Sequence, residues 1–535
     1  MKSIVIITLS ILCLSNLTLA QPDKKEASMI DGALLGPKLI AAKHEFNENN
    51  MRGALTLYRE VLDVEPNNYA ALYGTAQCHY YLKKYNLALE YLDKAVAIRP
   101  NESAETQFFY GQTYHRTGKL DEAISSFQKF TAFQKKTSYE VELAVQFIQE
   151  CKYAKAMMAH PAPVQVTNMG DVVNSRFDDY TPSISSDNKT LLFTSRRNTN
   201  GNRIDEKGDY KYFEDIFSSE YDESTGTWSK ARAVEGQLNT DTYDAVLSVS
   251  PDGNSMFVYK NNTGNAGDIY YSTRNVESGE WGAAEKLERP INSSYFESSV
   301  TITADGNILF FISERPEGLG QGDIYMSEKK NGRWSNPKNL GEIINTESDE
   351  KFVFIHPNGK TLYFASNGHR TMGSYDIFKS EWVNGEWSLP VNLGYPINTV
   401  NEESTFSLSA DNSRMYLSAE LNDSFGERDI YVLDVSQYDL VAKGYDKLSA
   451  GQLVCTVRDG KNNTVRGVEL QLCDENGQLI SIFSTNKEGV CKITTEGNRN
   501  YIVKAVNDKL EMVEYKVNLQ LKATGETIIP VEIKI

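Results

Sequence analysis

The sequence has 535 residues, with 55 Lys and Arg against 72 Asp and Glu, which gives a formal net charge of −17 at pH 7. At roughly 150 residues per domain, this length predicts about three or four domains rather than one core. The acidic charge argues against a nucleic-acid binder and against a polybasic membrane-surface protein, since both need clustered positive charge. Only six histidines are present, which disfavours a His-rich metal site or a multi-His catalytic centre.

The first 20 residues have the pattern of a secretory signal peptide. Lys2 supplies the positive n-region, Ile4–Leu14 the apolar h-region and Thr18–Ala20 the cleavage site. The h-region is too short for a transmembrane helix, and no later run approaches the ~18 apolar residues that such a helix needs. Cys13 lies inside the h-region and lacks the small residues expected before a lipoprotein cysteine. We therefore expect an exported chain in the periplasm, or associated with the outer membrane, that carries no lipid.

Residues 30–160 have a helical pattern that repeats about every 34 positions. The repeated positions are small alanines, large residues one turn later and Pro-Asn exits: Ala54, Ala88, Ala123, Tyr58, Leu92, Phe127, Pro66-Asn67 and Pro100-Asn101. Small residues at a helix crossing, large ones one turn later and Pro at the exit are typical of tetratricopeptide repeats. Three such units bury a continuous core, and Val141–Met158 is predicted to be the cap helix.

From residue 163 to residue 436 the period changes to 53 and the pattern becomes that of short β-strands. Four tryptophans follow this period: Trp228, Trp281, Trp334 and Trp387. So do four turn dipeptides: Asp252-Gly253, Asp305-Gly306, Asn358-Gly359 and Asp411-Asn412. An Asp-Ile-aromatic motif occurs five times, beginning at Asp215, Asp268, Asp323, Asp376 and Asp429. Five copies predict five blades of about four strands each, and therefore a five-bladed β-propeller.

The ends of this array indicate how the ring closes. An Asn-Thr or Asn-Ser pair follows each of the first four blades, and an additional copy, Asn174-Ser175, precedes the first blade. Leu440 stands where the fifth blade would have its tryptophan, so that blade lacks a last strand. We therefore expect Val164–Val173 to supply it, which would remove the open sheet edges. A polar insertion at Asn198–Glu214 is predicted to be a loop on one face of the propeller.

After a linker near Ser436–Ser449, residues 450–535 alternate short strands with turns. About seven strands in about 85 residues predict a small Ig-like β-sandwich. Five runs are expected as strands: Leu453–Val457, Val468–Leu472, Ile480–Ser484, Tyr501–Val506 and Ile528–Ile535. Five cysteines follow the signal peptide: Cys78, Cys151, Cys455, Cys473 and Cys491. They are either buried thiols or, for the last three, include one disulfide, and the sequence leaves both alternatives open.

The repeat motifs carry a resemblance to known families. The turn Ser250–Gly253 and its relatives are similar to the WD40-like repeat of TolB-type propellers. Gly467-Val468, with the segment from Ser484 to Gly489, resembles a carboxypeptidase-regulatory-like domain. Signal peptide, tetratricopeptide repeats, propeller and this sandwich, in that order, resemble the PorE-like periplasmic proteins of the type IX secretion system. That resemblance implies other envelope or secretion-system proteins as partners.

The sequence departs from that family in two respects. The family usually ends in an OmpA-like domain that binds peptidoglycan, whereas this sequence stops at Ile535. It also lacks the lipoprotein signal of the family member that resembles it. Peptidoglycan anchoring is therefore not expected from the resemblance.

Motifs of common catalytic sites are missing from the sequence, including Gly-x-Ser-x-Gly, His-Glu-x-x-His, the P-loop and Cys-x-x-Cys. We therefore predict no enzyme, no cofactor and no catalytic metal. The repeated aspartates could bind Ca²⁺, but one per blade is more economically a turn residue that accepts backbone N–H bonds. The repeated tryptophans could stack on a glycan, but a fixed position in every blade favours packing between blades.

The concave face of the tetratricopeptide repeats is the predicted partner-binding groove. Helical spacing places eight residues on it: Lys43, Phe46, Tyr73, Gln77, Tyr80, Phe108, Gln112 and Arg116. Such a face binds an extended or helical peptide through aromatic contacts and side-chain amides, although some of these aromatics could instead be core residues between helices. A two-carboxylate clamp is not expected, because only Lys43 and Arg116 are basic among them.

The sequence is compatible with two functions, that of an interaction scaffold and that of a ligand-binding protein. The first is a non-enzymatic scaffold that mediates protein–protein interactions in an envelope assembly, through type IX secretion if the resemblance holds. The alternative is a propeller that binds glycan or peptidoglycan fragments in sensing or uptake.

Overall fold

The computed structural model describes residues 24–100, 103–133, 138–198, 204–205, 210–261, 267–275, 277–383, 385–438, 440, 450–477, 479–486, 488–496, 499–506, 512–520 and 528–535. The predicted signal peptide at residues 1–20 lies outside these residues, as does most of the predicted linker and part of the insertion at Asn198–Glu214. The chain forms two compact units, Met1–Asn101 and Glu102–Ile535, and each is described by itself.

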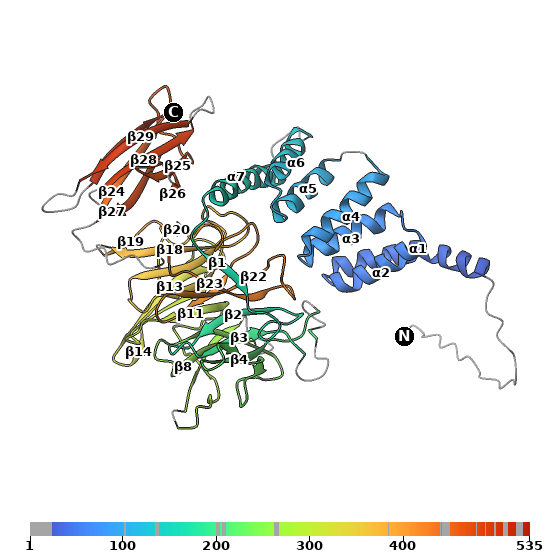
Figure 1. The fold of residues 1–535 in the computed structure, drawn as a ribbon, viewed down its shortest axis with the longest axis horizontal. Helices are drawn as coiled ribbons and strands as arrows, with labels where there is room; N and C mark the ends of the chain where they lie inside the picture. Colours follow the sequence, from blue (N-terminus) through green and yellow to red (C-terminus); the bar gives the residue numbers. More distant parts are fainter. Residues whose placement is uncertain are drawn as a thin grey trace, which may run out of the picture. The chain divides into compact units, whose positions relative to one another are not determined.

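The described residues of the first unit form four helices, drawn in blue in Figure 1. They are α1 (Lys24–Asn47), α2 (Met51–Val64), α3 (Tyr69–Tyr81) and α4 (Tyr85–Ile98). Asn50 and Asn68 cap α2 and α3, since each side-chain oxygen accepts a bond of 3.0 Å from a backbone N–H of the first turn. Tyr58 packs against Gly74, where an added Cβ would overlap the tyrosine ring. Small residues facing large ones thus hold the helices together, as the repeat pattern predicts.

The second unit begins with three further helices. They are α5 (Ala104–Arg116), α6 (Leu120–Phe133) and α7 (Tyr139–Ala159). Their core includes Phe127 and Tyr153 and extends to Met372 and Val400 of the following β-region. The third helix pair and the cap helix therefore pack with the propeller, so the repeats expected over residues 30–160 are divided between the two compact units.

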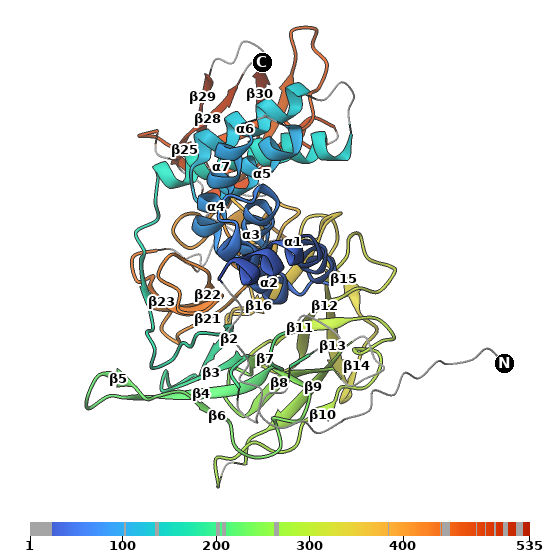
Figure 2. The same cartoon turned by 90° about the vertical axis from the view of Figure 1, so that its right-hand side faces the viewer.

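Five sheets, ordered along the chain, form the five-bladed propeller (Figure 2). Blade 1 contains β2 (Asp179–Ile184), β3 (Thr190–Ser195), β4 (Asp215–Asp222), β5 (Thr227–Trp228) and β6 (Arg232–Ala233). Blade 2 contains β7 (Tyr243–Val249), β8 (Ser255–Asn261), β9 (Asp268–Thr273) and β10 (Glu285–Lys286). Blade 3 contains β11 (Glu297–Ile302), β12 (Ile308–Ser313), β13 (Asp323–Lys330), β14 (Arg333–Trp334) and β15 (Lys338–Asn339). Blade 4 contains β16 (Glu350–Ile355), β17 (Thr361–Ser366), β18 (Asp376–Val383), β19 (Glu386–Trp387) and β20 (Val391–Asn392).

The fifth blade is completed by the segment that precedes the first. It contains β21 (Thr405–Leu408), β22 (Arg414–Ala419), β23 (Asp429–Asp434) and β1 (Gln165–Asn168). β1 pairs antiparallel with β23, with Gln165 opposite Asp434 and Asn168 opposite Tyr431. The predicted closure is therefore confirmed, with a strand shorter than the expected Val164–Val173.

The Asn-Ser and Asn-Thr pairs are joints between neighbouring blades. In blade 3, the Asn345 carboxamide accepts from Ile324 N at 2.8 Å and donates to Ile324 O at 3.0 Å. The next residue, Thr346, donates through its N–H and its hydroxyl to Glu350 at the start of blade 4. The asparagine thus binds the blade just completed, and the hydroxyl residue binds the blade that follows.

The repeated tryptophans pack between blades. Trp228 of blade 1 lies edge-on to Tyr416 of blade 5, with ring centroids 6.1 Å apart. Trp387 of blade 4 lies edge-on to Phe310 of blade 3 at 6.1 Å. Trp334 packs against the apolar cluster that contains Phe257 of blade 2. These contacts support the interpretation as packing residues rather than as a glycan platform.

The end of the chain forms a β-sandwich of seven strands in two sheets. One sheet has the order β27 (Val490–Glu496), β24 (Ala450–Arg458), β30 (Ile528–Lys534). The other has the order β26 (Leu479–Ser484), β25 (Glu469–Asp474), β28 (Arg499–Val506), β29 (Met512–Leu519). The core between the sheets includes Leu453, Leu470, Ile493 and Val503. All five runs expected as strands are present, and β27 and β29 complete the number.

The five cysteines that follow the predicted signal peptide are buried thiols. Cys455 and Cys491 are register partners on β24 and β27. Burial raises the pKa of both thiols to about 12. The structure thus favours buried thiols over a disulfide in the sandwich.

Candidate functional site

Five of the predicted groove residues lie in the first compact unit. Lys43 and Phe46 are on α1, and Tyr73, Gln77 and Tyr80 are on α3. The three α3 residues follow the spacing i, i+4, i+7, which places them on one face of the helix. All three are half-buried and Lys43 is exposed. The α3 face, defined as Tyr73, Gln77 and Tyr80, therefore offers aromatic area with polar ends.

Neighbouring rings hold the aromatic side chains of this face in place. Tyr73 stacks on Tyr69 with centroids 5.9 Å apart. Tyr80 is edge-on to Tyr81 at 5.7 Å and to Tyr85 at 5.4 Å. Rings positioned before binding lose less conformational entropy on contact with a partner. This arrangement suits recognition of a peptide segment.

Another face of α3 carries a buried histidine that the sequence motifs do not single out. His79 is 3% exposed and stacks on Tyr91 with centroids 5.4 Å apart. Its ring nitrogens have no hydrogen-bond partner in the part of the chain that the structure describes. Burial, with a smaller contribution from Arg59, lowers the pKa of His79 to about 4. The ring is therefore neutral at pH 7 and acts as a packing residue.

The three predicted groove residues of α5 belong to the second unit, and two of them have internal roles. Phe108 packs against Phe127, Phe130 and Phe147, with centroids 4.9 to 6.2 Å away. Arg116 donates from Nη1 to the backbone oxygen of Val400 at 2.5 Å. Phe108 is thus a core residue between helices, and Arg116 binds α5 to the propeller. Gln112 is half-buried, and its role in binding stays a prediction.

The repeated aspartates of blades 3 and 5 accept backbone N–H bonds. Asp323 accepts from Leu319 N at 2.5 Å and Gly320 N at 3.1 Å. Asp429 accepts from Phe425 N at 2.8 Å. Within the described residues, no group of three or more His, Cys, Asp and Glu side chains could hold a metal ion. The aspartates therefore fit the interpretation as turn residues.

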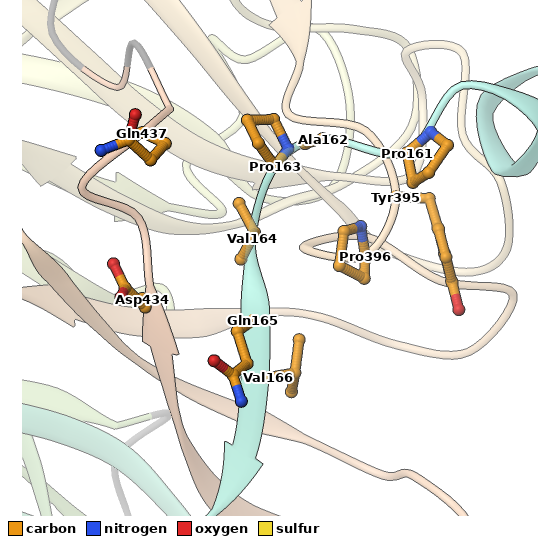
Figure 3. Close-up of a pocket in the computed structure, with 10 residues that line it drawn as sticks. All are labelled: Pro161, Ala162, Pro163, Val164, Gln165, Val166, Tyr395, Pro396, Asp434 and Gln437. Carbon is orange, nitrogen blue, oxygen red and sulfur yellow. The ribbon is translucent and has the colours of Figure 1, made fainter.

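A shallow hollow of about 660 Å³ lies where the chain leaves α7 and enters the fifth blade (Figure 3). Val164, Gln165 and Val166 run along it, with Tyr395 and Pro396 on one side. The backbone N–H of Ala162 donates to Tyr395 O at 2.6 Å. The lining is mostly apolar and contains no nucleophile beside a base, so the hollow shows no catalytic arrangement.

No helix among the described residues combines the length and the apolar character needed to span a membrane. A family model for subunit 3 of the anaphase-promoting complex, or cyclosome, matches residues 47–130. This match covers α2 to α5 and most of α6. Among curated protein sequences, none matches the chain.

Solved structures of both kinds of fold are similar to parts of the chain. TolB from Acinetobacter baumannii is 18% identical over 56% of this chain and 71% of its own, with a TM-score of 0.30. The first tetratricopeptide domain of human RPAP3 is 17% identical over 23% of this chain and 97% of its own, with a TM-score of 0.20. The type III secretion chaperone SycD of Yersinia enterocolitica, solved with a peptide of the translocator YopD, is 15% identical. That similarity covers 23% of this chain and 95% of SycD, with a TM-score of 0.21.

These similarities are too low to carry an argument about function. The helix pairs, the matched family model and the closed ring of blades together establish tetratricopeptide-like repeats followed by a β-propeller. Folds of these two kinds are generally interaction modules rather than enzymes.

Proposed function

We propose that the protein is a non-enzymatic scaffold whose α3 face binds a partner protein in the cell envelope. We further propose a role in type IX secretion, because the order of the domains resembles that of the PorE-like periplasmic proteins. Export rests on the signal-peptide pattern of the first 20 residues. Other envelope or secretion-system proteins are the proposed partners.

The observation that carries the proposal is the α3 face itself. Two tyrosines and one glutamine share one side of a single helix and are half-buried, each tyrosine fixed by neighbouring rings. Tyrosine is enriched in binding hot spots because it combines large contact area with a polar end. Lys43 and Phe46 of α1 belong to the same proposed groove.

A binding test of the α3 face should replace its tyrosines and not Arg116. Arg116 is left out, because its substitution would also remove the bond to Val400. A glycan-binding propeller has less support, because Trp228, Trp334 and Trp387 pack between blades. We therefore keep the α3 face as the proposed site.

The test is a full-length Tyr73→Ala/Tyr80→Ala variant, first compared with the unmodified protein by thermal unfolding. Each truncation should weaken association by ~1–3 kcal/mol, or roughly 5- to 150-fold, with partners captured from the cell envelope. Tyr139→Ala is the matched control, since Tyr139 is 75% exposed and lies on α7. Unchanged capture by the folded double variant would exclude the α3 face. Cell fractionation tests export separately.

A further inference from the structure

A second cavity, of about 550 Å³, lies within the second unit between α7, the fourth blade and the sandwich. Gln146, Gln149 and Glu150 line it from α7, and His369 and Arg370 line it from the loop after β17. This volume is in the usual range for ligand pockets. Neither the α3 face nor the proposed function makes use of it.

Glu150 is the unusual group in this cavity. Its side chain is buried at 8% exposure. One carboxylate oxygen, Oε1, accepts from Gln146 Nε2 at 2.9 Å. The other, Oε2, has no hydrogen-bond partner among the described residues. A buried carboxylate oxygen without a donor is costly, so a donor is missing at this position.

The arginines near Glu150 are already engaged with other groups. Arg370 donates to Glu469 at 2.5 Å and lies over the ring of Tyr153, 4.8 Å from its centroid. Arg116 donates to the Val400 carbonyl. Both arginines therefore belong to contacts that hold the second unit together.

A second buried carboxyl group, on the fourth blade, interacts electrostatically with Glu150. Asp376 is fully buried, and one of its oxygens has no partner among the described residues. Burial, and after it the charge of Glu403, raises the pKa of Asp376 well above its usual value. Burial likewise raises the pKa of Glu150 to about 7, against the opposing effects of Arg116 and Gln146. These carboxyl groups therefore retain protons near neutral pH, and an incoming cation would favour the ionised form of Glu150.

We propose that this cavity binds a primary ammonium group, with Glu150 Oε2 as its counter-ion. An ammonium is a compact point charge that one carboxylate oxygen can accept. A guanidinium prefers both oxygens in a planar fork, and Gln146 occupies one of them. The source of the group is a lysine side chain of a peptide, because the cavity exceeds the size of a simple amine.

The test uses the full-length protein and three capped peptides in isothermal titration calorimetry. They are Ac-Ala-Lys-Ala-NH2, its norleucine counterpart and its arginine counterpart, and n-pentylamine is a fourth probe. The lysine peptide should bind at least tenfold more tightly than the norleucine and arginine peptides. It should also bind more tightly than n-pentylamine, and equal binding of these two would identify free amines as the source. Equal affinities for the lysine and norleucine peptides, or no binding of any probe, would overturn the proposal. This result requires only the unmodified protein.

Two variants locate the binding. Glu150→Gln should weaken binding of the lysine peptide at least tenfold, while Glu142→Gln, at an exposed position of the same helix, should leave it unchanged. Affinity should rise from pH 6 to pH 8, because Glu150 must ionise to act as a counter-ion. Undiminished binding by folded Glu150→Gln protein would exclude this site. Neither result depends on the α3 face, so the two proposals fail separately.

Discussion

The side-chain carboxamide of Asn174 binds both backbone groups of Ile430, although the two residues are 256 positions apart. Ile430 N donates to Asn174 Oδ1 at 2.8 Å, and Asn174 Nδ2 donates to Ile430 O at 2.9 Å. Asn345 makes the same pair of bonds to Ile324, which is only 21 positions away. One local motif thus serves both an ordinary blade joint and the closure of the ring.

Replacing Asn174 by Ala should destabilise the propeller more than replacing Asn345. Both changes leave buried backbone groups of an isoleucine without partners, which costs about 1–3 kcal/mol per group. Asn174→Ala also weakens the joint between the first and the last segment of the propeller. These two segments are far apart in the sequence, so no short stretch of chain links them. All five tryptophans lie in the propeller, so their fluorescence during denaturant unfolding measures its stability. Equal losses in the two variants would show that the closure has no energetic significance of its own.

Glycine is required where the loop before β23 meets the segment between β1 and β2. A Cβ added to Gly426 would lie 2.8 Å from the carbonyl carbon of Phe177 and closer still to its oxygen. Gly320 and Gly373 make the corresponding close approaches to the loops of the next blades, at the period of 53 residues. The sequence shows the 53-residue spacing of these glycines. The turn dipeptides do not identify them, because these glycines are not in tight turns.

Gly426→Ala should therefore reduce the free energy of unfolding of the propeller by about 1–3 kcal/mol, the usual cost of a forced overlap. Gly460→Ala is the control, because nothing lies within 4 Å of the corresponding Cβ. The measurement is again tryptophan fluorescence against denaturant concentration. A Gly426→Ala protein as stable as the control would mean that the loop around Phe177 moves aside without cost.

Periodic features were predictable from the sequence because each blade must solve the same packing problem. Trp228 and its counterparts mark the blades, and Asn174-Ser175 marks the closure. The strand β29 is not among the five strands that we expect from the sequence. However, the alternation of Val513, Tyr515 and Val517 with polar residues is that of a half-buried strand. A count of alternating positions would have found it.

Contacts between distant segments could not be predicted in the same way. Arg116 has the spacing of a groove residue, and nothing in its helix indicates that Val400 lies beside it. The same holds for Phe108, whose neighbours come from α6 and α7. Helical spacing identifies a face of a helix, and the partner of that face depends on how separate elements pack.

The five cysteines that follow the predicted signal peptide should react with a thiol reagent only after unfolding. Burial raises the pKa of Cys78, Cys151, Cys455 and Cys491 to about 12, and Cys473 is 2% exposed. The thiolate is the reactive form, so both protonation and burial protect these groups at pH 8. The check is reaction with DTNB before and after addition of guanidinium chloride. Rapid reaction of the folded protein, or a loss of two hydrogens by mass spectrometry, would contradict the assignment as buried thiols.

Buried acids at the starts of the blades differ in their cationic partners. Asp179, Asp244 and Glu297 form salt bridges at 2.7 to 3.3 Å, with Arg197, Lys260 and Arg315 respectively. No salt bridge to Glu350 or Glu403 occurs within the described residues, and in blade 4 the His369 ring binds the Ile344 carbonyl at 2.8 Å. At Gly368, two positions after Ser366, an added Cβ would lie 2.6 Å from Thr346 Cβ, which leaves no room for a long basic side chain. Glu350 and Glu403 are therefore buried without a salt-bridge partner among the described residues.

Stability of the propeller should consequently fall as the pH rises from about 5 to about 8. Burial raises the pKa of Glu350 and Glu403 to about 7. Since the folded state binds these protons more tightly, their stabilising effect is complete below the unfolded pKa of about 4.3 and is lost as pH rises through the folded pKa.

Glu350→Gln/Glu403→Gln should flatten this decline in stability, which amounts to a few kcal/mol at roughly 1.4 kcal/mol per pKa unit. The measurement is the denaturant midpoint of tryptophan fluorescence at pH 5, 6, 7 and 8, with the exposed Glu386→Gln as control. If the double variant and the control decline equally with pH, these two acids are ionised in the folded protein and the assignment fails.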